Sequence, residues 1–260
     1  MLSKALIQER LQTRFVGRKL FVFETIDSTN ACAKTLAEAD TAEGAVVLAE
    51  FQTQGKGRLG RPWEAEANEN LLFSVILRPS LPRPLAGLLT FFASVAVARA
   101  IEGTGAPSVE CKWPNDVLLD GRKVCGILLE NSLKGETIEY SVVGIGLNVN
   151  QERFPDFLRD RATSLRIALG RPVDRLDLLA RVLLSLERTY EDVRRGDFDA
   201  ILADWTSRCT MFGREITVAQ DNDLVTGKAV GLNEDGGLVL QTPSGPRTIY
   251  AGDISLLPSH

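Results

Sequence analysis

Residues 112–128 read KWPNDVLLDGRKVCGIL, in which a polar motif is followed by two short apolar runs. The run VECKW from Val109 and the run VCGILLE from Val124 have the length and composition of strands. Asp120-Gly121, between VLL and the second run, is a turn signal. Pro114 cannot donate to a strand ladder, so pairing should stop at the polar motif. The stretch therefore predicts a strand that ends in polar side chains and is followed by a β-hairpin.

The rest of the chain divides into two parts of different texture. Further strands are expected at KLFVFET, GAVVLAEF, LLFSVIL and YSVVGIGLNVN, which begin at Lys19, Gly44, Leu71 and Tyr140. Apolar patterns predict helices over residues 2–15, 85–101, 174–195 and 198–209. After Met211, short alternating segments are separated by turns, as in a small β-barrel. We predict an α+β catalytic domain with a mixed α/β sheet over residues 1–210 and a β domain over residues 211–260.

Composition excludes several classes of function. The formal net charge of −4 argues against a surface built mainly to hold nucleic acid. The four cysteines form no CxxC pair, so we expect no zinc site and no disulfide framework, and a reducing cytoplasm is the default. No apolar run reaches the roughly 20 residues of a membrane span. The only histidine is His260, which argues against Ser-His-Asp, Cys-His and HExxH chemistry.

A second dense motif, GKGRLGRPW, covers residues 55–63 and combines glycines with the cations Lys56, Arg58 and Arg61. Crowded like charges repel one another unless an anion is bound, and glycines let backbone N–H groups approach that anion. The motif also matches GxGxxG. The dinucleotide version must open a helix, whereas a strand follows here, and the kinase version needs HRD and DFG elements that are absent. The motif indicates a polyphosphate or carboxylate ligand, and a plain surface hairpin is the alternative.

Single residues in these motifs allow two interpretations each. Asn115 and Asp116 could hold Mg²⁺ or a ribose, or could simply start a turn after Pro114. Lys123 opens a predicted strand, where it is either a point charge for an anion or a solvated hairpin lysine. Trp63 is either a core residue or a wall against which adenine stacks.

Four motifs taken together resemble biotin protein ligases, enzymes that attach biotin to a carboxylase carrier. They are DSTN at 27–30, AEFQTQGKGRLGRPW at 49–63, KWPNDVLLDGRKVCGILLE at 112–130 and GIGLNVN at 144–150. The resemblance extends to the C-terminal β segment. It implies a catalytic domain of the biotin/lipoate ligase type, followed by a small SH3-like β-barrel.

The resemblance also implies roles for individual residues. Biotin would be held by Ser28, Thr29, Asn30, Gln52, Lys56, Gly57, Arg58, Lys123 and Gly126. ATP would contact Arg58, Arg61, Trp63, Asn115, Lys123 and Asn148. Mg²⁺ would lie near Asn115 and Asp116, Gly146 would line the ligand wall with Gly126, and Lys123 and Arg58 would be the catalytic cations. Family members often have arginine at the position of Lys56, and some have arginine at the position of Leu59, which bears on how tightly the adenylate is retained.

The implied chemistry suits these residues. A biotin carboxylate that attacks the α-phosphate of ATP brings two anions together, so clustered cations and Mg²⁺ supply positioning and charge stabilisation without a histidine base. The biotinyl-5′-AMP would then biotinylate one lysine of a biotin carboxyl carrier protein, the biotin domain of acetyl-CoA carboxylase. The sequence leaves open whether the enzyme forms a homodimer.

Two alternatives follow from the same resemblance. A ligase for lipoate or octanoate is one, because similar folds activate carboxylates of different shape. A biotin-sensing repressor is the other, since some relatives carry an N-terminal helix-turn-helix. The ligand motif begins at Asp27, which leaves no room before it for a three-helix DNA module. We therefore predict no specific DNA binding and no membrane association.

Overall fold

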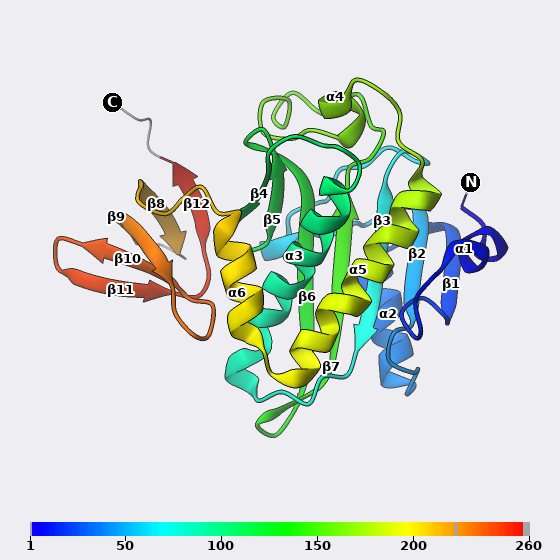
Figure 1. The fold of residues 1–260 in the computed structure, drawn as a ribbon, viewed down its shortest axis with the longest axis horizontal. Helices are drawn as coiled ribbons and strands as arrows, with labels where there is room; N and C mark the ends of the chain where they lie inside the picture. The colour runs from blue at the N-terminus through cyan, green and yellow to red at the C-terminus, as the bar shows by residue number, and fades with distance from the viewer. Residues whose placement is uncertain (1, 221–222, 257–260) are drawn as a thin grey trace.

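The computed structural model describes residues 2–220 and 223–256, and its larger part is built on a seven-stranded mixed sheet (Figure 1). The strand order is β1-β2-β3-β7-β6-β5-β4. The strands are β1 (Leu20–Ile26), β2 (Val46–Gln52), β3 (Leu71–Leu77), β4 (Val109–Lys112), β5 (Asp116–Leu119), β6 (Arg122–Lys134) and β7 (Thr137–Leu147). Only β1 and β2 pair in parallel within this sheet. The hairpin predicted from residues 112–128 is confirmed as β5 and β6, joined at Asp120 and Gly121, both with positive φ.

Helices cover both faces of this sheet. Figure 1 shows α3 (Leu88–Glu102), α5 (Arg175–Arg195) and α6 (Phe198–Ser207) in front of the sheet and α2 (Thr29–Glu38) behind it. The sequence predicts three of these helices from apolar patterns and places the start of α2 at the DSTN caps, where Ser28 is indeed the N-cap. Short helices complete this part: α1 (Lys4–Arg10), α4 (Leu165–Leu169), η1 (Arg58–Gly60) and η2 (Arg83–Gly87).

Two helix predictions are too long. The helix expected over residues 2–15 is only α1, because Ser3 caps it and the chain becomes extended at Leu11. The helix expected from residue 85 begins with the 3₁₀ turn η2, and α3 follows it. By length and composition alone, Arg83–Glu102 would pass as a membrane-crossing helix, but 72% of its apolar window is buried inside the fold. It is the central core helix.

The chain ends in a five-stranded antiparallel sheet with the order β11-β10-β9-β8-β12. Its strands are β8 (Glu215–Gln220), β9 (Asp223–Leu232), β10 (Leu238–Thr242), β11 (Gly245–Ile249) and β12 (Asp253–Leu256). The β structure predicted after Met211 is therefore confirmed, while the domain boundary at residue 210 stays a prediction. The two sheets are tied together where the buried Trp113 donates from Nε1 to the Gly236 carbonyl at 3.1 Å. His260 lies outside the described residues.

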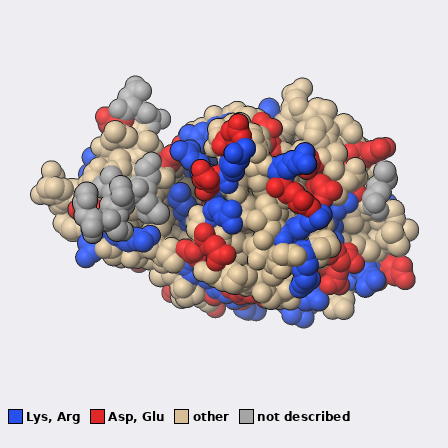
Figure 2. Space-filling model, turned by 90° about the horizontal axis from the view of Figure 1, so that it is seen from above, with Lys and Arg blue, Asp and Glu red and all other residues tan. Residues whose placement is uncertain are grey.

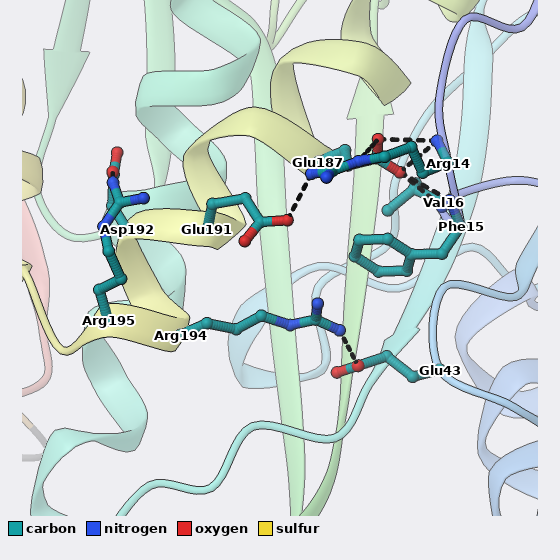
Figure 3. Close-up of polar contacts among 9 residues, drawn as sticks. All are labelled: Arg14, Phe15, Val16, Glu43, Glu187, Glu191, Asp192, Arg194 and Arg195. Atoms are coloured by element: carbon teal, nitrogen blue, oxygen red, sulfur yellow. Dashed lines mark hydrogen bonds and ion pairs between the residues drawn. The ribbon is translucent and has the colours of Figure 1, made fainter.

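A buried glutamate fastens the segment before β1 to helix α5. Figure 3 shows Glu187 of α5 facing the backbone of residues 14–16. Its carboxylate accepts from the N–H groups of Arg14, Phe15 and Val16 at 2.8–3.1 Å. Burial raises the pKa of the Glu187 carboxyl, but these N–H donors lower it by more, so the pKa lies below its ordinary value.

Glu187→Gln should lower the free energy of unfolding by about 1–2 kcal/mol at neutral pH, because the amide offers a single acceptor oxygen and no charge to these donors. The folded-state pKa lies below the ordinary value of 4.5, so the carboxylate stabilises the fold fully above that pH. This stabilisation is lost as the pH falls through the folded-state pKa. The free energies of unfolding of the two proteins, measured by urea denaturation across this pH range, should therefore become equal in acid.

Glu191→Gln is the matched control. Glu191 lies one turn along α5 and pairs with Arg14 at 2.7 Å, but its side chain is 32% exposed and that of Arg14 is 75% exposed. Such a pair contributes about 0–1 kcal/mol. A loss for Glu187→Gln that is no larger than the control, or that does not change with pH, would contradict the assignment.

Candidate functional site

One cavity brings together the residues that four separate motifs contribute. It has a volume of about 750 Å³ and lies where β5, β6 and β7 meet the glycine-rich loop and the C-terminal sheet. Every residue predicted to hold biotin, ATP or Mg²⁺ lines it: Ser28, Thr29, Asn30, Gln52, Lys56, Gly57, Arg58, Arg61, Trp63, Asn115, Asp116, Lys123, Gly126 and Asn148. The structure thus gathers positions up to 120 residues apart in the chain, from 28 to 148, around one space.

The glycine-rich loop is a folded hairpin that forms one wall of the cavity. The N–H of Gly57 donates to the Arg61 carbonyl at 2.7 Å, and the N–H of Trp63 donates to the Gly55 carbonyl at 2.9 Å. At its tip Leu59 adopts a positive φ of 56° and is 72% exposed. The plain hairpin interpretation was therefore right about local shape, but the loop also lines a cavity with its cations.

Arg58 and Arg61 contact the C-terminal sheet. Arg61 forms an ion pair with Asp253, and Arg58 donates at 3.4 Å to the Gly252 carbonyl and to Asn115 Oδ1. Burial lowers the pKa of Arg58, while Asp253 and Asp116 raise it and Arg61 lowers it further. The guanidinium remains a cation, since arginine is effectively always protonated in proteins. This end of the cavity is therefore suited to an anionic ligand.

Lys123 is held between a carboxylate and an aromatic ring. Its Nζ lies 2.6 Å from Asp116 Oδ1 and 5.3 Å from the centre of the Trp63 ring. Its backbone is fixed as well, because its N–H donates to the Arg161 carbonyl at 2.8 Å. With 33% of the side chain exposed, Lys123 is not a freely solvated hairpin lysine. It is a positioned cation that a ligand can reach.

Glycines on β6 and β7 make room for Trp63. A Cβ added at Gly146 would stand 2.5 Å from Trp63 Cε2, and one added at Gly126 would stand 2.7 Å from Cζ3. Neither distance is compatible with a real side chain, so both strands need glycine where the ring lies. The indole Nε1 is buried without a hydrogen-bond partner. Trp63 is therefore a wall of the cavity, and its contact with adenine stays a prediction.

Asn115 and Asp116 do not form a ready-made metal site. No group of three or more His, Cys, Asp or Glu that could hold a metal occurs among residues 2–220 and 223–256. Asn115 Oδ1 faces Arg58 and Asp116 Oδ1 faces Lys123. One accessible carboxylate fits a Mg²⁺ ion whose other ligands are phosphates and water, which is the usual arrangement for this ion.

Asn148 offers an unused acceptor to a ligand. Its amide nitrogen donates to the Thr163 carbonyl at 3.0 Å, which orients the side chain. Its Oδ1 is buried and has no hydrogen-bond partner. A buried acceptor without a partner is costly, so a donor from a bound molecule would relieve it.

The sequence analysis missed several cavity residues. Phe154, Leu158, Asp160, Arg161 and Ala162, from the loop after β7, line the cavity, as do Asp253 and Ile254 of the C-terminal sheet. No motif marks them, because long-range pairing places them there. Two further residues, Ser74 and Glu130, lie outside the cavity and form hydrogen bonds with the side chain of Asn30, which lines it. Ser74 had a signal that could have been used, since it is the one polar residue in the apolar strand LLFSVIL.

One face of the molecule carries mixed charge. Figure 2 shows Lys and Arg side chains interspersed with Asp and Glu on the face seen from above. That face has no single broad positive field of the kind that holds a nucleic acid backbone. The cations of the cavity are therefore a local feature.

Two family models match this chain. The biotin/lipoate A/B protein ligase family matches residues 22–148, and the biotin protein ligase C terminal domain matches residues 211–257. The bifunctional ligase/repressor BirA of Bacillus subtilis is 37% identical over 98% of this chain and 79% of its own length. The biotin–acetyl-CoA-carboxylase ligase of Paracoccus denitrificans is 33% identical over 88% of this chain and 96% of its own. The solved biotin protein ligase from Aquifex aeolicus in complex with biotin and ATP covers 93% of this chain with its full length, at 33% identity and a TM-score of 0.77.

Proposed function

The chain belongs to the biotin/lipoate A/B protein ligase family, and from that membership and the geometry of its cavity we propose that it is a biotin protein ligase. It activates biotin with ATP to form biotinyl-5′-AMP and transfers the biotinyl group to a lysine of a carboxylase carrier. The observation that carries this proposal is the convergence of Lys123, Arg58 and Arg61 on one cavity whose other end is lined by uncharged polar side chains.

The first step needs two anions to meet. A carboxylate oxygen of biotin attacks the α-phosphorus of ATP, and the bond to the β-phosphate oxygen breaks with release of pyrophosphate. Lys123 and Arg58 would hold the carboxylate and α-phosphate together, and Arg61 would exchange Asp253 for the leaving phosphates. Preorganised cations of this kind stabilise charge that develops in the transition state. No protein nucleophile takes part.

The second step requires only that the carrier lysine lose a proton, because its neutral amine is the nucleophile. The carrier lysine amine attacks the acyl carbon of the mixed anhydride, an amide bond forms and AMP leaves. We propose the biotin domain of acetyl-CoA carboxylase as the carrier, in agreement with the name of the Paracoccus relative. Four free cysteines support a cytoplasmic location, since thiols persist in reducing compartments.

We propose that Mg²⁺ enters with ATP and that Asp116 is its nearest protein carboxylate, with Asn115 beside it. The ion would neutralise charge on the phosphates. Lys123 would then leave Asp116 for the α-phosphate, which couples metal entry to the placement of the catalytic cation.

The polar end of the cavity favours biotin over lipoate or octanoate. Thr29, Asn30 and Gln52 supply hydroxyl and amide groups there, and these suit a ureido ring that both donates and accepts hydrogen bonds. An acyl chain without such a ring would offer these groups no further hydrogen bonds, and so would gain no selective contact there. A repressor role has no comparable support in the residues that line the cavity.

Biotin-dependent exchange of pyrophosphate into ATP tests the proposal directly. Purified protein with Mg²⁺ should incorporate labelled pyrophosphate into ATP when biotin is present, and far less with lipoate or octanoate. A carrier domain should then gain one biotinyl group on a lysine. Formation of ADP and phosphate, or equal exchange with octanoate, would reject the proposal.

A further inference from the structure

Two residues outside the cavity complete a continuous hydrogen-bond chain behind its polar end. Glu130 of β6 accepts from Asn30 Nδ2 at 2.7 Å. Ser74 of β3 donates to Asn30 Oδ1 at 2.6 Å and lies 2.8 Å from Thr29 Oγ1. The Thr29 N–H donates to Gln52 Oε1 at 2.7 Å, and Thr29 Oγ1 lies 3.0 Å from the same oxygen. The chain thus runs from a carboxylate to an amide that lines the cavity.

The middle of this chain is buried and has little freedom for rearrangement, whereas Glu130 at its outer end is exposed. Ser74, Thr29 and Asn30 are 0%, 4% and 5% exposed. A Cβ added at Gly144 would stand 2.1 Å from Asn30 Oδ1, so the bare glycine backbone of β7 is what admits the asparagine amide. Buried polar groups in such a network must each be satisfied by their neighbours.

The chain has a direction, and Glu130 sets it. An ionised carboxylate only accepts, so the NH₂ group of Asn30 must face Glu130 and its oxygen must face Ser74. The single proton of Ser74 then points at Asn30. The Thr29 hydroxyl must then donate to Ser74 Oγ, and the Thr29 N–H holds Gln52 with Oε1 turned toward Thr29. The NH₂ group of Gln52 is left to donate elsewhere, beside Gly55 at the start of the glycine-rich loop.

We propose that Glu130 and Ser74 are positioning residues that fix the donor and acceptor pattern which the biotin pocket presents to the ureido group. The inference rests on the proposed function and adds residues to it. Without Glu130, only the Leu128 carbonyl, 3.4 Å from Asn30 Nδ2, would oppose a turn of the Asn30 amide that presents NH₂ to Ser74. Ser74 would then accept from Asn30 and donate to Thr29 Oγ1, which reverses the Ser74–Thr29 bond and frees the Thr29 hydroxyl proton to point elsewhere.

Glu130→Gln is the most informative change, because it keeps the size of the side chain and lets it donate as well as accept. The KM for biotin in pyrophosphate exchange should rise roughly tenfold, which is the effect of losing one hydrogen bond to a charged group. The KM for ATP should stay within about twofold, since the chain does not reach the cations. Ser74→Ala should give the same split by breaking the chain at its centre.

A second readout measures the pattern itself. In 2-iminobiotin a guanidinium donates where the carbonyl oxygen of biotin accepts, so a pocket with a fixed pattern should discriminate strongly between the two acids. Both variants should lose a large part of this discrimination. Glu139→Gln, an exposed carboxylate on β7 that accepts from Ser132, and Ser94→Ala, a fully buried serine of α3, are the matched controls. Neither should change biotin KM or discrimination.

The outcomes separate the two proposals. Calorimetric binding of biotin without ATP tests the chain even if wild type catalyses no exchange, whereas absence of exchange in wild type refutes the proposed function alone. A protein that binds no biotin at all refutes both. If biotin affinity and discrimination in folded Glu130→Gln and Ser74→Ala match those of the controls, the chain is only structural and the inference is overturned.

Discussion

Lys123→Ala is expected to slow formation of biotinyl-5′-AMP by about 10²–10³-fold, because one preorganised cation that faces developing charge contributes about 2.7–4 kcal/mol. Lys123 lies 2.6 Å from Asp116 and 5.3 Å from the Trp63 ring centre at the wall of the cavity, so only the end of its side chain has to move from Asp116 when the α-phosphate arrives. Single-turnover measurement of adenylate formation, with the melting temperature as a check on folding, gives the comparison.

Removal of Lys123 has a side effect that needs its own control. It leaves Asp116 without its counter-ion, and a lone carboxylate would repel the phosphates. Lys123→Ala combined with Asp116→Asn, compared with Asp116→Asn alone, separates the two causes, because both proteins lack the carboxylate and differ only in the cation. Lys134→Ala, at the exposed far end of the same strand, should leave the rate unchanged. A double variant that regains the wild-type rate would mean that Lys123 acts only by neutralising Asp116.

The hairpin and the strands could be predicted because their signals are local. β5 and β6 are consecutive, and two adjacent residues, Asp120 and Gly121, specify the turn between them. The DSTN caps predict the start of α2 for the same reason, since a cap acts within one helical turn. The cavity residues were found where family motifs and cations coincide, and the fold brings them together.

The predictions that were wrong or incomplete depend on contacts between residues that are far apart in the sequence. The helix expected over residues 2–15 stops at Arg10. The backbone N–H groups of residues 14–16 instead donate to the carboxylate of Glu187, which lies more than 170 positions away. No window of sequence contains both partners. The cavity residues Arg161 and Asp253 were missed likewise, because one is placed by a backbone bond to Lys123 and the other by an ion pair with Arg61. Tertiary contacts over such separations override local preference.

Glu50 and Arg175 form a buried ion pair whose disruption should have the largest effect on stability. Glu50, at 1% exposure of its side chain, ends the apolar run of β2, and Arg175 opens α5. Arg175 Nη1 lies 2.5 Å from Glu50 Oε2 and also donates to the Asn70 carbonyl at 3.0 Å, while Glu50 Oε1 accepts from the N–H of Leu2 at 2.6 Å. The pair thus joins the N-terminal segment, the sheet and the long helix.

Arg175→Ala is expected to lower the free energy of unfolding by about 3–5 kcal/mol, because it leaves an uncompensated charge in the interior. The destabilisation should come mainly from the unpaired Glu50 carboxylate and not from the lost attraction. Glu50→Leu combined with Arg175→Met should therefore be less destabilised than Arg175→Ala alone, since well-packed apolar residues can replace a buried pair at little cost. Urea denaturation of the single and double variants forms the cycle that measures this difference.

The exposed pair on the same helix provides the reference. Arg181 lies 2.9 Å from Asp177, but both side chains are about half exposed, at 53% and 47%. Asp177→Ala should cost no more than about 0.5 kcal/mol, as for other pairs spaced by four residues on a helix surface. If Arg175→Ala cost as little as Asp177→Ala, water would have to reach Glu50 in the folded protein. If the double variant were instead as unstable as Arg175→Ala, the pair would stabilise the fold by its attraction, and the argument from desolvation would be wrong.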